Sequence, residues 1–474
     1  MPGLRAGPLP DGPFDVAVVG AGVVGAAIAR ELTSRGVSCA LIEAAADVGT
    51  GTSKANTAIH HTGFDAKPGT LEAKLLPTGF RRLGEYAAAV GIPMGTTGAL
   101  MVAWTQEQLA ALAEVEATAA ANGYTHTRAV PVAELYEREP SLGPGALGGV
   151  EIPDEGIICP FTTTLAFATE AVLGGCALAL CAPVEDVAQG DLFTLRTPRG
   201  PLRAHFLVNA AGLRSDEIDA MLGHRDFTVT PRRGELIVFD KLARGLVSHI
   251  ILPVPTAKTK GVLVSPTVYG NVLLGPTADD IESKDDRSTT AGGLAGLLEA
   301  SERIVPGLAE HEVTATYVGL RAATESRDYQ LRIEAEQRYA CVGGIRSTGV
   351  SASMAIAEHV CDGLADAGLD LPHDARPPEL RMPNIGELSP RPYEAGENGR
   401  IVCFCERVTQ GELTNATGSP IPPADLDGMR RRTRALMGRC QGFFCAANVA
   451  ATMADAGGAS VADLLGAGGG PRDA

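Results

Sequence analysis

The chain has 474 residues, of which 45% are hydrophobic and 20% are charged. This composition is typical of a soluble globular protein, and the length predicts about three domains. The formal net charge of −16 argues against a nucleic-acid-binding protein, because an acidic surface repels the phosphate backbone. The sequence contains no run of about 18 apolar residues, so it predicts no membrane-spanning helix. Residues 1–13 lack the apolar core of an export signal, so we expect a disordered tail and a cytoplasmic protein.

A strand–turn–helix–strand pattern opens the chain. Residues 14–19 form a short apolar run, which favours a buried parallel strand. The sequence GAGVVG follows at 20–25, and after it come a helix and a second strand that ends at Glu43. This order predicts the first unit of a doubly wound α/β sheet.

The glycine-rich turn has the spacing of a dinucleotide-binding motif. Gly20 permits a tight turn, Gly22 lets a pyrophosphate approach the backbone, and Gly25 lets helix and strand pack closely. The pyrophosphate would sit at the helix N-terminus, where free N–H groups favour negative charge. Glu43 is placed to accept hydrogen bonds from ribose hydroxyls. We predict dinucleotide binding rather than a glycine-rich core turn, but the motif does not separate FAD from NAD.

Segments spread over most of the chain resemble FAD enzymes of the D-amino-acid-oxidase superfamily. They are Thr52-Ser53-Lys54-Ala55-Asn56, His61-Thr62-Gly63-Phe64-Asp65, Pro68-Gly69-Thr70, Asn209-Ala210-Ala211-Gly212 and 344–349. Further segments are similar to the anaerobic-type glycerol-3-phosphate dehydrogenases, namely 231–235, 253–256, 270–271, 275–277 and 319–321. The L-2-hydroxyglutarate oxidases share the first half of this pattern. The resemblance therefore indicates the cofactor more narrowly than the substrate.

The resemblance implies an FAD site made from several separate segments. The residues that it assigns to FAD are Gly20, Gly22, Gly25, Glu43, Thr52, Ser53, Asn56, Val184, Ala211, Gly212, Thr348, Gly349 and Val350. In this family the position of Val184 touches the adenine through its backbone, and a helix that begins at 348–350 points at the flavin. A helix N-terminus would stabilise the negative charge that develops on a reduced flavin.

Two adjacent histidines are candidates for the base that takes a hydroxyl proton during alcohol oxidation. His61 occupies the position of the family's histidine, and an imidazole titrates in a suitable range. His60 is the alternative in register. The other interpretation of His61 is a hydrogen bond to the backbone of its own loop.

Several basic residues are candidates for binding an anionic substrate. Arg321 matches the substrate arginine of the family, and a guanidinium binds phosphate or carboxylate bidentately; the alternative is a surface ion pair. Arg233, Lys258 and Lys260 are weaker candidates, since such charges more often lie on a solvated face. Arg346 stands where relatives usually have an acidic or neutral residue, and this difference leaves the substrate open.

Four cysteines cluster near the end of the chain, as Cys403-Phe404-Cys405 and Cys440-x-x-x-x-Cys445. Four thiolates at one point repel one another unless they bind metal. A 2Fe–2S cluster takes four cysteines, whereas zinc sites usually have Cys-x₂₋₄-Cys at both ends, for which Cys-x-Cys is awkward. The segment also resembles the bacterioferritin-associated-ferredoxin-like domain. We expect a 2Fe–2S cluster, with zinc or unmetallated thiols as the alternatives.

Together these observations predict an α/β chain with a Rossmann-type FAD domain, an inserted mixed α+β substrate domain and a small helical iron–sulfur domain. The expected boundaries are 14–85, 155–225 and 335–370 for the FAD domain, 86–154 and 226–334 for the substrate domain, 371–400 for a linker, 401–465 for the 2Fe–2S domain and 466–474 for a disordered tail.

The expected function is oxidation of a small anionic secondary alcohol. The leading candidate is sn-glycerol 3-phosphate, which would yield dihydroxyacetone phosphate by hydride transfer to flavin N5. Electrons would then pass through the 2Fe–2S cluster to an acceptor protein or a quinone-linked partner, which is compatible with peripheral association with a membrane. A 2-hydroxy acid dehydrogenase or oxidase and a non-catalytic electron-transfer subunit are the alternatives.

Overall fold

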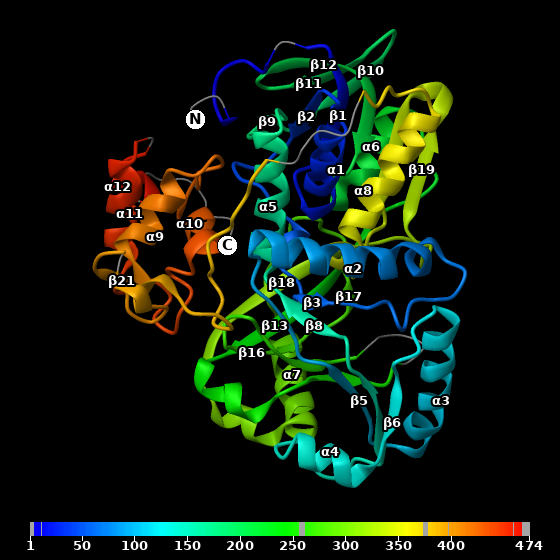
Figure 1. Cartoon of the computed structure of the whole chain (residues 1–474), viewed down its shortest axis with the longest axis vertical. Helices are drawn as coiled ribbons and strands as arrows, with labels where there is room; N and C mark the ends of the chain where they lie inside the picture. Colours follow the sequence, from blue (N-terminus) through cyan, green and yellow to red (C-terminus); the bar gives the residue numbers. More distant parts are fainter. Residues whose placement is uncertain are drawn as a thin grey trace.

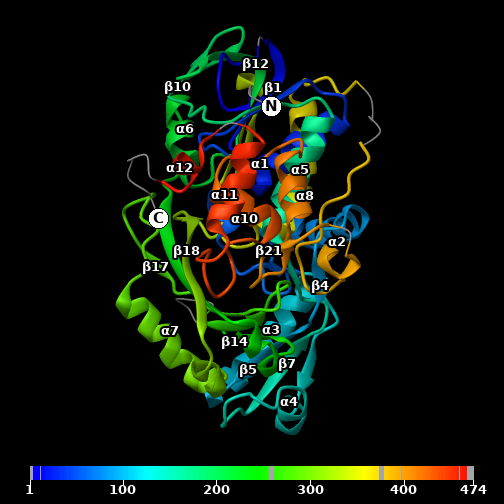
Figure 2. The same cartoon turned by 90° about the vertical axis from the view of Figure 1, so that its left-hand side faces the viewer.

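The computed structural model describes residues 4–10, 12–255, 261–372, 378–396, 398–457 and 459–466. Two large sheets lie one above the other along the long axis of the molecule, and a small C-terminal module, residues 401–466, lies at their side (Figure 1). Seen from that side, the module lies in front of the junction between the two sheets (Figure 2). The predicted α/β class is confirmed.

The first sheet contains the predicted strand–turn–helix–strand unit. Its strands are β1 (Phe14–Val19), β2 (Cys39–Ile42), β9 (Ala177–Ala179), β10 (Asp186–Gln189), β11 (Phe193–Thr197), β12 (Gly200–Asn209), β19 (Gln330–Glu334) and β20 (Tyr339–Gly343). β1 pairs in parallel with β2 and β12, and β9 and β20 extend the parallel part on either side. β10, β11 and β19 add antiparallel pairs. Because β19 belongs to this sheet, the last segment of the FAD domain begins before residue 335, the boundary that the sequence predicted.

Helices cover both faces of the first sheet. They are α1 (Val23–Ser34), α2 (Leu71–Val90), α5 (Pro160–Leu173), α6 (Ser215–Met221) and α8 (Gly349–Asp366). α1 packs between α5 and α8 in one hydrophobic core, and α2 lies along α8. α6 joins the core on the opposite face. Apolar runs in β1 and β2 are therefore buried on both sides, as parallel strands between helices require.

The second sheet is mixed. Its strands are β5 (Ala99–Ala103), β6 (Arg128–Val130), β7 (Gly148–Ile152), β13 (Thr230–Phe239), β14 (Ile250–Pro253), β15 (Leu263–Pro266), β16 (Val272–Gly275), β17 (Asp279–Asp280) and β18 (Val313–Ala323). Helices α3 (Gln106–Ala121), α4 (Val132–Arg138) and α7 (Ala291–Ile304) accompany it. β13 and β18 form the longest antiparallel pair and run toward the first sheet. A small sheet of β3 (Ile59–His60), β8 (Gly156–Ile158) and β4 (Met94–Thr96) lies between the two.

The C-terminal module has its own core. It contains β21 (Ile401–Cys403), β22 (Val408–Thr409), α9 (Gln410–Thr417), α10 (Leu426–Thr433), α11 (Ala446–Asp455) and α12 (Val461–Leu464). α9 begins with a capping box, in which Thr409 and Glu412 satisfy each other's backbone N–H groups. Within the described ranges, no helix has the length and apolar character needed to cross a membrane.

Two segments that the sequence predicted to be unstructured pack against the body. The start of the chain is not a free tail, because Leu4 and Leu9 are buried and the Leu4 carbonyl accepts a hydrogen bond from Leu180 N at 2.7 Å. Residues 378–396 are not a free linker either. Met382 and Ile385 are buried, and Met382 N donates to the Val90 carbonyl at 2.7 Å. The predicted disorder after residue 466 lies outside the described residues.

Candidate active site

The turn between β1 and α1 has the backbone geometry that its glycines predicted. Gly20 has a φ of +102°, and a Cβ there would lie 2.5 Å from the Ala210 carbonyl oxygen. A Cβ on Gly25 would clash with the Gly20 carbonyl oxygen. Helix α1 begins directly after Gly22 with no acidic residue in its first turn. This helix end therefore offers its N–H groups and its positive dipole to an anion.

The segment from Glu43 to Asn56, called the flanking segment below, encloses this turn. Glu43 accepts hydrogen bonds from Ala21 N at 2.8 Å and Ala45 N at 2.9 Å. Burial raises the pKa of Glu43 above its ordinary value in spite of these two donors. Ser53 Oγ accepts a hydrogen bond from Val23 N at 2.9 Å. Glu43 thus braces the turn, and its predicted contact with a ribose would use the remaining lone pairs.

Strand β18 of the second sheet fixes the far end of the flanking segment. Thr52 donates to the Leu320 carbonyl at 2.7 Å, and Tyr317 donates to the Asn56 carbonyl at 2.7 Å. The side chain of Asn56 folds back on its own loop and donates to the Ser53 carbonyl at 2.9 Å. A Cβ on Gly319 would clash with the Ala55 carbonyl oxygen, so strand and loop are in close contact. The flanking segment and the second sheet are therefore held in a defined arrangement.

The remaining predicted FAD residues follow the carboxyl ends of the parallel strands. Ala211 and Gly212 come directly after β12, and Val184 follows β9 and is half-buried. Thr348 precedes α8, and its hydroxyl hydrogen-bonds Tyr329 and Glu72 at 2.6 Å each. Ligands bind outside this edge in open α/β sheets.

His61 lies between two carboxylates. Its Nδ1 is 3.0 Å from Glu155 Oε1, and its Nε2 is 3.1 Å from Asp65 Oδ1. Its backbone N donates to Ser351 Oγ at 2.9 Å, which joins it to the first turn of α8. Burial alone would lower the pKa of His61, but the two carboxylates outweigh it and raise the pKa to about 10. His61 is therefore an imidazolium at neutral pH.

His60 has the opposite character. Its ring stacks on Phe80 at 4.2 Å between centroids and hydrogen-bonds the Phe80 carbonyl at 2.9 Å. Burial lowers the pKa of His60 to about 4, so it stays neutral. Since His60 faces helix α2 and His61 is joined to the N-terminus of α8, the structure favours His61 over the register alternative. Asp65 lies only four residues from His61, whereas Glu155 lies far away in sequence and no sequence signal singled it out.

Arg321 on β18 carries a half-buried guanidinium. It pairs across the sheet with Arg232 and donates to the Thr277 carbonyl at 3.3 Å. Burial first, and then the charges of Arg232 and Arg346, lower the pKa of Arg321 to about 10. Arg232 forms a bidentate pair with Asp280, whereas Arg321 has no carboxylate partner among the residues that the structure describes. This arrangement leaves one half-buried positive charge for an incoming anion.

The weaker cationic candidates do not join Arg321 in the described structure. Arg233 alternates with Arg232 along β13, so it faces the other side of the sheet. There it pairs with Asp286 and lines a cavity of about 470 Å³ beside α7. Lys258 and Lys260 lie outside the described residues. Arg346 donates to the Arg327 carbonyl at 2.7 Å and lies close enough to Arg321 to lower its pKa.

The four C-terminal cysteines form two pairs. Cys403 lies beside Cys445 and Cys405 lies beside Cys440, close enough for each thiol to shift the pKa of its neighbour. Across the described ranges, no group of three or more His, Cys, Asp or Glu side chains is arranged to hold a single metal ion.

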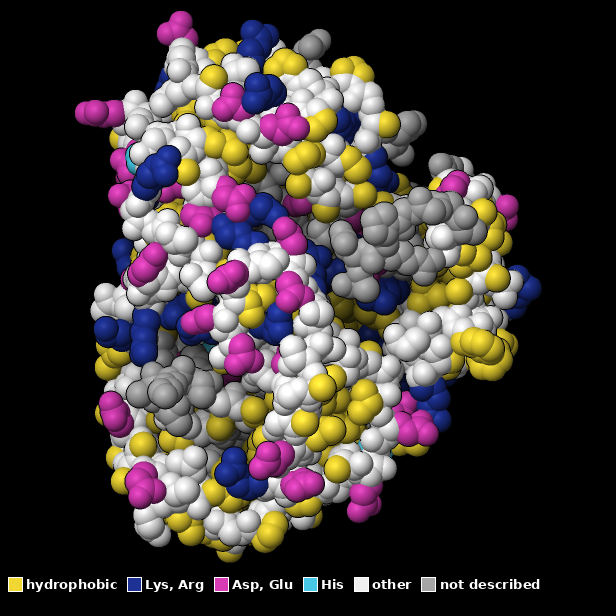
Figure 3. Space-filling model, turned by 180° about the vertical axis from the view of Figure 1, so that it is seen from behind, with side chains coloured by type: hydrophobic (Ala, Val, Ile, Leu, Met, Phe, Trp, Pro, Cys, Tyr) yellow, Lys and Arg dark blue, Asp and Glu magenta, His cyan; other side chains and the backbone are white. Residues whose placement is uncertain are grey.

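Phenylalanines beside these cysteines are exposed to solvent. They are Phe404, Phe443 and Phe444, with 74%, 85% and 72% of their surface accessible. Hydrophobic side chains gather on the outer face of the C-terminal module (Figure 3).

Comparison with known proteins decides the family. The model of the FAD dependent oxidoreductase family matches residues 15–363. The chain belongs to this family. A glycerol 3-phosphate dehydrogenase from Caloramator mitchellensis is 34% identical to this FAD-dependent oxidoreductase over 449 residues, which cover 92% of the chain and 93% of the relative.

Two more relatives bear on the substrate. The solved structure of an L-alpha-glycerophosphate oxidase from Mycoplasma pneumoniae, with FAD bound, aligns with a TM-score of 0.71 at 26% identity, over 75% of this chain and 95% of its own. An L-2-hydroxyglutarate dehydrogenase from Indibacter alkaliphilus is 28% identical over 272 residues, or 56% of this chain and 68% of the relative. The glycerol-phosphate enzymes therefore match this oxidoreductase over a larger share of its length.

The described residues fit FAD. The first turn of α1 has no acidic side chain, and Gly22 precedes it directly, so no Cβ lies at this position. Thr52 holds the flanking segment against β18, and Ser53 holds it against the start of α1. The chain is thus an enzyme of the FAD-dependent oxidoreductase class.

Proposed function

We propose that the enzyme oxidises sn-glycerol 3-phosphate to dihydroxyacetone phosphate. The observation that carries the proposal is the half-buried Arg321 guanidinium, which has no carboxylate partner in the described chain and lies on the strand that anchors the flanking segment. A phosphate monoester supplies the charge that such a site lacks and accepts two parallel N–H bonds from it. The similarity to glycerol 3-phosphate dehydrogenase over 92% of the chain supports the same substrate.

Arg321 and His61 would have separate roles. Arg321 binds the phosphate and orients the substrate, and the neighbouring charge of Arg346 adds to the attraction. His61, in its neutral form, accepts the hydroxyl proton, while Glu155 and Asp65 hold its ring in place. FAD, when bound, supplies the acceptor for the hydride that leaves the substrate carbon. Because the two carboxylates raise its pKa to about 10, His61 is mostly protonated at neutral pH, and the neutral base becomes more available as pH rises.

The four cysteines would hold a 2Fe–2S cluster. Each iron of such a cluster would take two thiolates. Two cysteine pairs fit this requirement better than they fit a single zinc ion, which takes four ligands at one point. Cys403 and Cys445 are buried and Cys405 and Cys440 half-buried, so one edge of the pairs is open to solvent. A cluster there supplies a one-electron acceptor, and the exposed phenylalanines beside it suit a protein or quinone-linked electron acceptor.

Replacing one cysteine tests the cluster. We expect Cys405→Ser to lose most of the iron and acid-labile sulfide that the wild type binds, because one iron is left with a single thiolate. FAD content should stay unchanged. Iron, sulfide and FAD are measured on protein purified without oxygen. Cys176→Ser is the matched control, since that cysteine lies outside the module. Zinc in place of iron in the wild type would contradict the cluster assignment.

A 2-hydroxy acid is the second candidate substrate, because a guanidinium binds a carboxylate bidentately as well. The similarity to L-2-hydroxyglutarate dehydrogenases over 56% of the chain favours it. Steady-state assays with an artificial electron acceptor separate the two. The proposal predicts a kcat/KM for sn-glycerol 3-phosphate at least a hundred-fold above those for L-2-hydroxyglutarate and for glycerol. A higher value for the hydroxy acid would overturn the substrate assignment and leave the enzyme class standing.

A further inference from the structure

We infer that the C-terminal module completes the FAD site, and that Arg431, Arg432 and Asp427 on α10 are positioning residues for the flanking segment. The inference rests on the binding of FAD by this chain. It concerns a contact between a nucleotide-binding segment and a helix almost 400 positions later in the sequence, as the separation of Asp47 and Arg432 shows. It assigns to the module a role that does not depend on electron transfer.

The flanking segment touches the dinucleotide turn at several points on both sides of Asp47. Before Asp47, Glu43 accepts the hydrogen bond from Ala21 N. After it, Gly49 N donates to the Ala21 carbonyl at 2.9 Å, and Ser53 accepts from Val23 N. A movement of Asp47 would therefore shift the contacts that shape the pyrophosphate-binding turn.

Two arginines of α10 hold the Asp47 carboxylate. Arg432 reaches both oxygens, at 2.6 and 2.7 Å, and Arg431 reaches one at 2.9 Å. Asp47 is only 2% exposed. Burial would raise the pKa of Asp47, but the two guanidinium groups outweigh it and hold the pKa below its ordinary value. The carboxylate is charged and depends on the module for its neutralisation.

A second ion pair holds the end of the flanking segment. Lys54, next to Ser53, pairs with Asp427 at 3.0 Å. Burial opposes the charge on Asp427, yet Arg431, Lys54 and Arg430 together lower its pKa to about 2. Arg431 contacts Asp427 as well, so the two ion pairs share one residue. The module therefore fixes the flanking segment at both Asp47 and Lys54.

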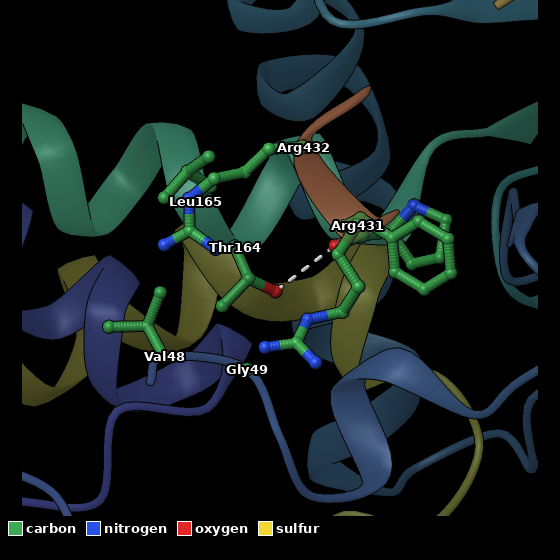
Figure 4. Close-up of a pocket in the computed structure, with 8 residues that line it drawn as sticks. Val48, Gly49, Thr164, Leu165, Arg431 and Arg432 are labelled. Carbon is green, nitrogen blue, oxygen red and sulfur yellow. Dashed lines mark hydrogen bonds between the residues drawn. The ribbon is translucent and has the colours of Figure 1, made fainter. Parts of the chain in front are cut away.

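The contact between α10 and the flanking segment is closely packed. A Cβ on Gly428 would lie 2.7 Å from Asp47 Oδ2, so only glycine lets α10 approach this far. Figure 4 shows Arg431 and Arg432 beside Val48, Gly49 and the α5 residues Thr164 and Leu165. The space that these groups leave is about 10 Å³, which is about that of one water molecule. Arg432 also donates to the Ile421 carbonyl, which fixes its orientation within the module.

Loss of the ion pairs from Arg431 and Arg432 would leave the Asp47 carboxylate buried and unpaired beside the turn. Asp47 would then move toward solvent and displace Val48 and Gly49, because an isolated buried charge is costly. The N–H groups at the start of α1 would remain, but the segment that encloses the cofactor would not hold its position. FAD affinity is therefore the property that reports on the contact between α10 and the flanking segment.

The test is the affinity of the full-length protein for FAD, measured by the quenching of FAD fluorescence on binding to protein stripped of cofactor. We expect Arg432→Met to weaken FAD binding at least ten-fold, with iron content and far-UV circular dichroism unchanged. Arg430→Met is the matched control, since that arginine lies on the same helix, is 41% exposed and contacts Asp427 but not Asp47. It should bind FAD within about two-fold of the wild type.

A second variant separates positioning from general damage. Asp47→Asn removes the buried charge, so we expect the double variant Asp47→Asn with Arg432→Met to bind FAD more tightly than Arg432→Met alone. Wild-type affinity in Arg432→Met, or a double variant no better than the single one, would overturn the inference. A wild-type chain that binds no FAD at all would overturn the proposed function as well, and the two failures are thus distinguishable.

Discussion

Replacing Arg321 with methionine should lower kcat/KM for sn-glycerol 3-phosphate by about a thousand-fold. Two parallel charge-assisted hydrogen bonds are worth about 4 kcal/mol together, and each 1.4 kcal/mol corresponds to about ten-fold in rate. The effect should be specific to the anion. Activity on glycerol, which has no phosphate, should change by less than about three-fold. Steady-state kinetics with an artificial acceptor measures both.

Arg233→Met is the matched control for Arg321. It removes a buried arginine from the neighbouring strand, but Arg233 faces Asp286 on the other side of the sheet. Its kcat/KM should stay within about three-fold of the wild type. If both variants lose activity equally, or if Arg321→Met loses glycerol activity in the same proportion, Arg321 does not bind the phosphate.

The pH dependence of the free enzyme should report on His61. Because its pKa is raised to about 10, the neutral imidazole becomes available only as pH rises, so kcat/KM should climb through the neutral range toward that value. His61→Asn should lower kcat by about a hundred-fold to ten-thousand-fold, the usual contribution of a general base. Pre-equilibrated assays between pH 6 and 10.5 measure both effects.

Glu155→Gln gives this prediction a direction. The substitution removes a negative charge 3.0 Å from the ring and keeps a hydrogen-bond acceptor. The imidazolium loses stabilisation, the pKa of His61 falls, and the rising limb of the profile should move toward neutral pH. Asp65→Asn should move the limb in the same direction, since Asp65 contacts the other ring nitrogen. A profile that is flat, or unchanged by Glu155→Gln, would show that His61 is not the base.

The parts of the fold that the sequence predicted are local in origin. The order strand, GAGVVG, helix and strand appears as β1, α1 and β2, and Gly25 is required by a contact within this unit, with the Gly20 carbonyl oxygen. The helix expected after Thr348 begins at Gly349. Composition and short-range spacing carry this information.

The two segments that were wrongly predicted to be unstructured are ordered by contacts with residues distant in sequence, which composition does not reveal. Residues 371–400 have the proline and glycine content of a linker, yet Arg391 is buried and donates to Glu412 of α9 at 3.2 Å. The N-terminal residues have a similar composition, but the guanidinium of Arg5 reaches the carbonyls of Ala46 and Pro422. Neither set of partners is near in sequence, so no periodicity could have revealed them.

The candidate site shows the same division. The family resemblance proposed His61 and Arg321, whereas the features that set their chemistry come from other segments. The charge of His61 depends on Glu155, and the absence of a carboxylate at Arg321 depends on Asp280 being taken by Arg232. The roles of α10 residues toward Asp47 likewise follow from the docking of the module, since a run of arginines in sequence predicts only a basic helix face.

The central claim is that this FAD-dependent enzyme takes electrons from sn-glycerol 3-phosphate. An anaerobic titration of the purified protein, followed by its visible spectrum, tests it most directly. The account predicts that sn-glycerol 3-phosphate bleaches the flavin absorbance, that the broader absorbance of the iron–sulfur cluster then decreases, and that L-2-hydroxyglutarate leaves both unchanged. A flavin that stays oxidised with glycerol 3-phosphate and bleaches with the hydroxy acid would contradict it.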